Sequence, residues 1–140
     1  MTNATKFKLL FLMAIAWLAV RGGGAIIVDP GGEAYIDTDG FAVLVIEESS
    51  ERHKLPVEQK NSIIGTAVPQ FVAINGGKFR RVDPTETETL DDPWASAVDE
   101  FEDEGLPLIV ISNTDPVGGY VGEYPENDAA AIELMEQYVD

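Results

Sequence analysis

The 140-residue chain contains no cysteine and a single histidine. The absence of cysteine excludes a disulfide framework, an iron–sulfur cluster, a cysteine-ligated zinc ion and any reaction of a thiolate nucleophile. One histidine leaves mainly carboxylates as metal ligands, which suit calcium or magnesium rather than zinc. The glycine clusters at 22–24 and 118–119 lack the residues of a phosphate-binding loop. We therefore expect no cofactor, no metal site and no thiol–disulfide exchange.

Basic residues are also scarce, with 9 Lys and Arg against 25 Asp and Glu and a formal net charge of -16. Residues 1–24 hold three bases and no acid, so all 25 acids and six bases lie in the remainder. Such an anionic body is repelled by a phosphate backbone, and the short cluster of Lys78, Arg80 and Arg81 does not reverse that. We exclude nucleic acid as a partner. The acidity favours solubility, with binding of a cation or a basic partner as the alternative.

Long hydrophobic runs are missing as well, since the longest, Leu9–Val20, has twelve residues. As a helix it rises about 18 Å, less than the ~30 Å hydrocarbon core of a bilayer. Basic residues precede it and small residues follow it, which is typical of a secretory signal over residues 1–25. The alternatives are an uncleaved anchor with membrane contact through residues 6–21 and an ordinary buried helix. We expect an exported or membrane-anchored protein.

Residues 26–40 are interpreted as a linker or a first strand, because Ala25–Val28 is strand-prone and ends in a turn cluster. A domain is expected over residues 41–140. Its first segment, Phe41–Ile46, is apolar at nearly every position, which predicts a strand buried on both faces and hence an α/β architecture. The further predicted elements are a helix or helix pair interrupted at Gly65 and Pro69, a strand at Lys78–Val82, a helix opened by Asp92-Pro93, strands at Leu108–Ser112 and Tyr120–Gly122, and a helix over about Asp128–Tyr138.

The buried faces of these helices follow from a helical period. The predicted stripes are Ile64, Val68, Phe71 and Val72 in the first helical region, Trp94, Ala97, Val98 and Phe101 in the next, and Ile132, Met135 and Val139 in the last.

The element order, together with a Leu106-Pro107 step before the third strand, resembles the thioredoxin-like fold over roughly residues 40–139. The resemblance implies a three-layer α/β sandwich, with a central mixed sheet of about four strands and helices on both faces. It also implies a cis bond at Pro107 beside a peptide-binding groove, whose candidate residues are Ser49, Ser50, Leu106 and Pro107. The region that holds Cys-x-x-Cys in thioredoxins, residues 47–56 here, has no thiol.

We therefore expect a redox-inactive thioredoxin-like domain that serves as a binding or structural module for a protein or extended peptide partner. One alternative is a hydrolase-type enzyme that uses the Ser49–His53 loop, where Ser50 and His53 stand three residues apart. Against it, the serines are suited to cap a helix and His53 to lie in solvent, so no catalytic residue is assigned. Another alternative is an acidic component of a larger viral or envelope assembly.

Overall fold

A computed structural model of the chain describes residues 33–139. The predicted signal or anchor over residues 1–25 and the strand-prone Ala25–Val28 lie outside this range. Within it, no helix is long and apolar enough to cross a membrane. The elements, in chain order, are β1 (Ala42–Ile46), the 3-10 helix η1 (Ser49–Lys54), α2 (Val57–Ile64), α3 (Ala67–Ile74), β2 (Lys78–Val82), α4 (Trp94–Phe101), the 3-10 helix η2 (Glu102–Glu104), β3 (Leu108–Thr114), β4 (Val117–Glu123) and α5 (Asp128–Glu136).

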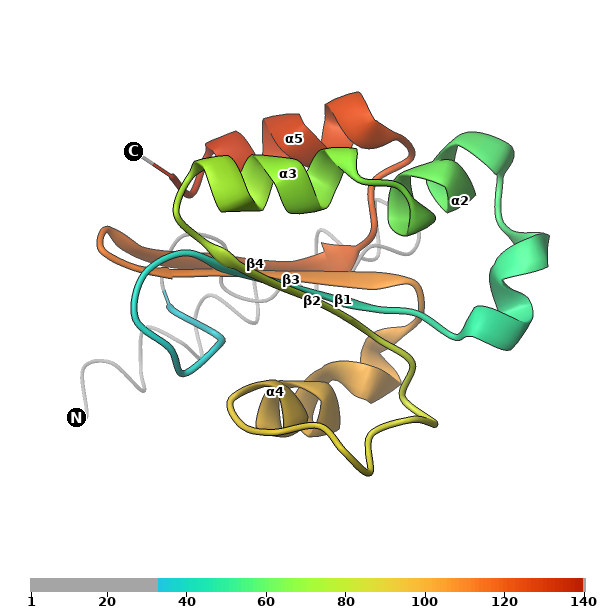
Figure 1. Cartoon of the computed structure of the whole chain (residues 1–140), viewed down its shortest axis with the longest axis horizontal. Helices are drawn as coiled ribbons and strands as arrows, with labels where there is room; N and C mark the ends of the chain where they lie inside the picture. The colour runs from blue at the N-terminus through green and yellow to red at the C-terminus, as the bar shows by residue number, and fades with distance from the viewer. Residues whose placement is uncertain (1–32, 140) are drawn as a thin grey trace, which may run out of the picture.

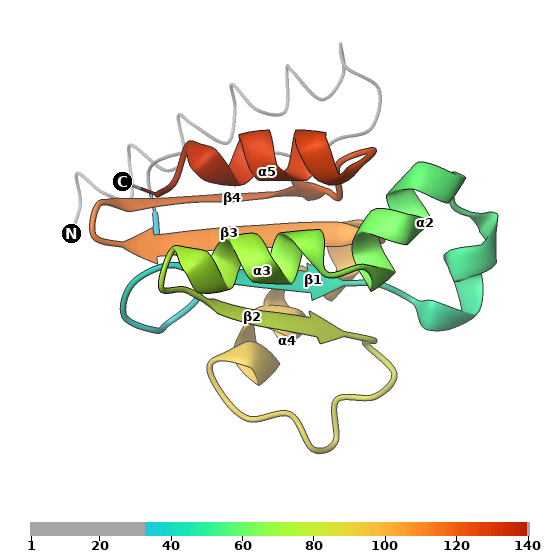
Figure 2. The same cartoon turned by 45° about the horizontal axis from the view of Figure 1, so that its top comes forward.

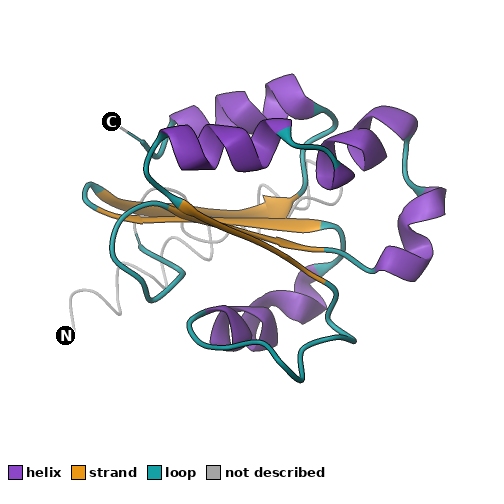
Figure 3. Ribbon diagram, in the orientation of Figure 1, coloured by secondary structure: helices purple, strands orange, loops and turns teal. Residues whose placement is uncertain are grey.

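The strands form one mixed sheet in the order β2-β1-β3-β4. β1 runs parallel to β2 and antiparallel to β3, and β4 is antiparallel to β3. Helices α2, α3 and α5 cover one face of the sheet and α4 covers the other (Figures 1 and 3). All five residues of β1 are buried, because helices lie over both of its faces. The predicted α/β architecture with a mixed four-stranded sheet is confirmed.

The helical region after η1 consists of two consecutive helices, α2 and α3, which confirms the predicted helix pair. The break lies at Gly65, whereas Pro69 does not interrupt the helix, because it stands in the first turn of α3. A Cβ at Gly65 would lie 2.7 Å from the carbonyl oxygen of Asn61, so the close turn between the helices needs glycine. The predicted face is wrong at one position: Ile64 is 44% exposed, and Ile63 is buried instead. The cause is the turn at Gly65, which ends α2 before its helical period can continue into α3.

The side of the sheet that carries α4 holds one core. All four residues of the predicted α4 stripe are buried there. Asp92 helps to start the helix, since its Oδ1 accepts hydrogen bonds from the N–H and the hydroxyl of Ser96 at 3.1 and 2.6 Å.

A second core lies between the sheet and α2, α3 and α5. In α5 the structure buries Met135, as predicted, together with Ala131, whereas Ile132 and Val139 are only partly buried. Asn127 caps this helix, because its Oδ1 accepts a hydrogen bond from the N–H of Ala130 at 2.8 Å.

β3 and β4 are each longer than predicted, because polar and glycine residues extend the pairing. Ser112 is buried in β3, where its Oγ accepts a hydrogen bond from the N–H of Ile36 at 3.0 Å. Gly119 of β4 leaves no room for a side chain, since a Cβ would lie 2.4 Å from the carbonyl oxygen of Glu33. Residues 33–41 form no helix or strand, yet Ile36 is buried in the core on the α4 side.

Candidate binding site at the end of β1

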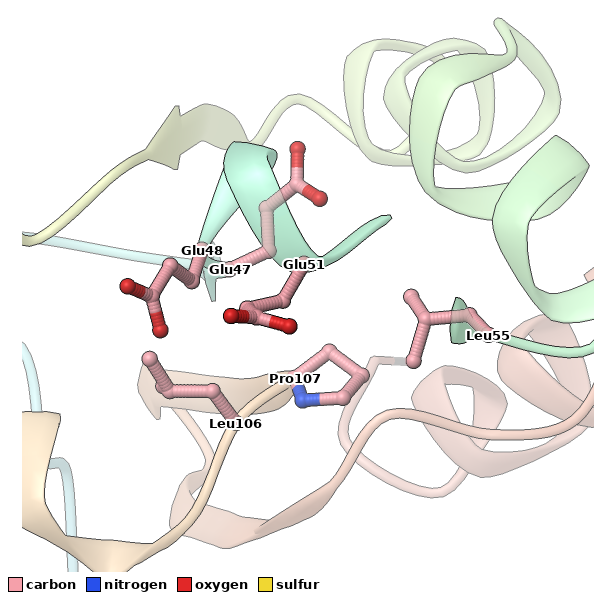
Figure 4. Close-up of a pocket in the computed structure, with 6 residues that line it drawn as sticks. All are labelled: Glu47, Glu48, Glu51, Leu55, Leu106 and Pro107. Carbon is pink, nitrogen blue, oxygen red and sulfur yellow. The ribbon is translucent and has the colours of Figure 1, made fainter. Parts of the chain in front are cut away.

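A cavity of about 260 Å³ lies where the carboxyl end of β1 meets the segment that leads into β3 (Figure 4). Its lining combines three glutamate residues from the β1–η1 region with apolar residues. The lining residues are Glu47, Glu48, Glu51, Leu55, Leu106 and Pro107. The cavity therefore joins parts of the chain about 50 residues apart, at an end of the sheet where loops rather than strands form the surface.

The Leu106–Pro107 bond on one wall is cis, as the resemblance implies, and the Asp92–Pro93 and Asp115–Pro116 bonds are cis as well. The carbonyl oxygen of Pro107 accepts a hydrogen bond from the N–H of Tyr124 at 3.0 Å, which ties this segment to the end of β4. Leu106 is half-buried, and within residues 33–139 its N–H and C=O have no hydrogen-bond partner. One donor and one acceptor of the main chain thus stay available beside the cavity.

Glu47 follows β1 directly and is only 3% exposed. Its N–H donates to the carbonyl oxygen of Val82 at 3.0 Å, which extends the pairing of β1 with β2. Arg52 donates to both carboxylate oxygens, with Nε at 3.0 Å from Oε2 and Nη2 in close contact with Oε1. This pairing raises the pKa of Arg52, chiefly through the hydrogen bond to Glu47. The buried charge is therefore compensated by a bidentate partner on η1.

The other two acids of the cavity differ from Glu47 in direction. Figure 4 shows the Glu47 carboxylate pointing away from Pro107, whereas Glu48 and Glu51 extend toward the Leu106–Pro107 segment. Glu51 is paired with Lys54 at 2.5 Å on the exposed side of η1. The hydrogen bond from Lys54 lowers the pKa of Glu51.

Asp83, which follows β2, holds the first residue of η1 in place. Its Oδ2 accepts hydrogen bonds from the N–H and hydroxyl of Ser49 at 2.9 and 2.6 Å. Its Oδ1 accepts from the N–H and hydroxyl of Thr85 at 2.9 and 2.7 Å. These bonds, with the Ser49 hydroxyl foremost, hold the pKa of Asp83 well below its usual range. Ser49 thereby ties η1 to the end of β2.

The four residues predicted for a groove separate into two pairs. Leu106 and Pro107 line the cavity, whereas Ser49 and Ser50 adjoin it in the chain without contributing to its lining. Ser50 and His53 are both exposed, and in the described part of the chain no hydrogen bond joins His53 to either serine. The hydrogen bond that the Ser49 hydroxyl donates goes to Asp83, so no serine–histidine pair is assembled here.

The sequence interpretation did not include Glu47, Glu48, Glu51 or Leu55 in the site. A signal for Glu47 does exist: it directly follows a fully buried strand, and a basic residue stands five positions later, within reach across one turn of helix. Across residues 33–139, no group of three or more Asp, Glu or His side chains is placed to hold a metal ion. No protein-family model, curated protein or solved structure matches the chain.

Proposed function

We propose that residues 41–140 form a thioredoxin-like domain without redox chemistry, which binds an extended polypeptide at the cavity beside Leu106. Three features support the thioredoxin likeness: the strand order β2-β1-β3-β4, the parallel β1–β2 pair, and the proline that leads into β3. The chain has no cysteine, so binding at this site proceeds without disulfide exchange.

The observation that carries the proposal is that the N–H and C=O of Leu106 have no hydrogen-bond partner among residues 33–139. In an extended peptide, the N–H and C=O of one residue point to the same side. That N–H can donate to the C=O of Leu106, and that C=O can accept from the N–H of Leu106. The side chains of Leu55 and Leu106 give the bound residue an apolar surface, and Glu48 and Glu51 stand at the side of the cavity. Such an arrangement gives affinity through the main chain and selectivity through the pocket.

The proposal extends to location. Lys6 and Lys8 before the apolar run Leu9–Val20 favour export or tethering of the binding domain outside the cytoplasm. Sequencing of the N-terminus of the protein purified from its source distinguishes a cleaved signal from a retained anchor. An intact N-terminus in protein from the soluble fraction would contradict both a cleaved signal and a retained membrane anchor.

The binding proposal is tested with linear random peptides displayed on phage, selected against the full chain. Selected peptides are then titrated against Leu106→Pro, which removes the N–H of this residue, and Leu106→Ala, which keeps it. We expect Leu106→Pro to weaken binding by about tenfold and Leu106→Ala to weaken it much less. Circular dichroism of both variants reports whether they fold.

Peptides that bind folded Leu106→Pro as tightly as the unchanged protein would contradict the role of the Leu106 main chain. Failure to select any peptide would contradict the function itself.

A further inference from the structure

β2 is the outermost strand on one side of the described sheet, where it pairs with β1 alone (Figure 2). The N–H of Lys78 donates to the carbonyl oxygen of Phe41 and the C=O of Val82 accepts from the N–H of Glu47, each at 3.0 Å. Because main-chain groups alternate in direction along a strand, those of Phe79 and Arg81 face away from β1. Within residues 33–139, these outward N–H and C=O groups have no hydrogen-bond partner.

This free edge carries an unusual charge for so acidic a chain. Lys78, Arg80 and Arg81 are three of the six basic residues that follow residue 24, and all three are exposed. Arg81 donates from Nη1 to the carbonyl oxygen of Ile63 at 2.7 Å, and Lys78 donates to the Thr38 hydroxyl at 3.0 Å. The main chain of Arg80 pairs with β1, but its side chain makes no hydrogen bond or ion pair in the described part of the chain, so its charge is free for a partner.

There is space beside the strand. A cavity of about 190 Å³ lies between Arg80, Arg81 and Val82 on one side and the loop after β2 on the other, with Glu86 and Leu90 in its wall. That loop makes no main-chain hydrogen bond to β2 within residues 33–139. Asp83 also lines the cavity, but its carboxylate is occupied by Ser49 and Thr85. Among the described residues, the loop thus leaves the outer edge of β2 without a main-chain partner.

The charges decide which strand can pair with this edge. A second copy in antiparallel register would set Arg80 against another Arg80, or against Lys78, and like charges directly opposite destabilise a strand pair. Basic residues on an edge strand discourage self-association in this way. The same residues favour an extended segment that carries carboxylates.

We propose that the free edge of β2 binds an extended acidic segment of a partner protein as a fifth strand of the sheet. The main chain of the segment pairs with the N–H and C=O groups of Phe79 and Arg81. Carboxylates on one of its faces lie opposite Lys78 and Arg80, which share a face of β2. This surface is separate from the cavity beside Leu106, and the proposal does not depend on binding there.

The test uses a fluorescein-labelled peptide of alternating Glu and Val, which presents carboxylates on one face when extended. Fluorescence anisotropy with the full chain measures its binding. Two matched peptides separate the contribution of charge from that of main-chain hydrogen bonds. One has Gln in place of Glu, and the other keeps every Glu but carries N-methyl groups on alternate residues. We expect N-methylation, which removes main-chain donors without changing charge, to weaken binding by about tenfold. The Gln peptide is expected to bind more weakly than the Glu peptide.

Variants of the protein locate the site. Arg80→Gln should weaken binding of the Glu peptide about two- to fivefold, the range for a cross-strand charge pair. Lys54→Gln removes the same charge on η1, outside β2, and should leave binding unchanged. Amide hydrogen exchange of the full chain adds a direct readout: the N–H groups of Phe79 and Arg81 should exchange fast in the free protein and slowly with peptide bound.

Several results would overturn the proposal. One is no binding at about millimolar peptide. A second is equal binding of the N-methylated peptide, which would leave only diffuse charge attraction. A third is equal weakening by Lys54→Gln and Arg80→Gln. Slow exchange at Phe79 and Arg81 in the free chain would show that this edge is already covered.

Discussion

The centre of the sheet and the carboxyl end of β1 are adjacent, yet different interactions hold them. β1 and most of β3 are buried between two apolar cores, whereas the end of β1 is held by the Glu47–Arg52 pair and by the bonds from Ser49 to Asp83. Apolar burial carries no charge, so it does not respond directly to protonation or to screening of charges, while ionised hydrogen-bonded groups respond to both. The centre therefore sets the fold, and the polar contacts set where η1 and the cavity lie.

The largest effect is expected at the centre. Leu44→Ala in β1 removes a side chain that is 0% exposed and packed against the α4 side. Loss of this burial and the cavity left behind should lower the free energy of unfolding by about 2–5 kcal/mol, measured by urea denaturation. Val117→Ala, at a residue that is 60% exposed, is the matched control and should change it by less than about 0.5 kcal/mol. Similar costs for the two variants would contradict the packed centre.

At the end of β1, Arg52→Ala should have the next largest effect. It removes the bidentate partner of the Glu47 carboxylate, whose side chain is 3% exposed in the unchanged protein, whereas that of Arg52 is 31% exposed. We expect a loss of about 1–3 kcal/mol in the free energy of unfolding.

The double variant Glu47→Gln/Arg52→Ala removes the unpaired charge, so it should be more stable than the sum of the two single changes predicts. Strict additivity in urea denaturation would mean that the two side chains do not interact.

Asp83→Asn tests the second polar contact, and its effect should depend on pH. The pKa of Asp83 is lowered in the folded chain by Ser49 and Thr85 from its usual 3.8. The contribution of the Asp83 charge to the free energy of unfolding is therefore present in full at pH values above 3.8. It is lost as the pH falls from 3.8 toward the lower pKa that Asp83 has in the folded chain. We expect the variant to cost about 1 kcal/mol at pH 7, comparable to loss of a helix cap, and progressively less in acid below about pH 4.

Asp99→Asn is the control, because the exposed side chain of Asp99 in α4 makes no hydrogen bond or ion pair in the described part of the chain. The difference in free energy of unfolding between Asp83→Asn and the unchanged protein should shrink in acid. If it stayed constant down to pH 2, a role of the Asp83 charge would be excluded.

The two regions also differ in how far the sequence predicts them. The β1 strand and the α4 stripe follow from local patterns, since apolar runs and a helical period depend on neighbours in the chain. The full extent of β3 and β4 does not follow from local patterns. Ser112 is buried in β3 where it accepts a hydrogen bond from Ile36, and Gly119 is needed in β4 where the main chain of Glu33 comes close. Both partners are distant in sequence.

The candidate site was predicted only in part, for the same reason. Leu106 and Pro107 were named through a resemblance, and they do line the cavity. The burial of Glu47 was missed because carboxylates are usually solvated, and only the folded turn brings Arg52 to it. Leu55 joins the lining because η1 turns back toward Pro107, and the spacing of residues in the sequence does not specify that turn.

The smallest effect is expected from Lys54→Ala, which removes the other ion pair of η1. Its partner Glu51 and Lys54 itself are 47% and 65% exposed. The pKa of Lys54 is raised and that of Glu51 is lowered, in each case chiefly by the hydrogen bond between them, but solvent and salt screen such a pair. We expect no measurable change in the free energy of unfolding, measured by urea denaturation at physiological ionic strength. Arg52→Ala, two residues away on the same short helix, should in contrast cause a clear loss. Both ion pairs include a basic residue of η1, and they differ mainly in burial. An equal loss of stability in the two variants would therefore contradict the idea that the burial of Glu47 strengthens its ion pair.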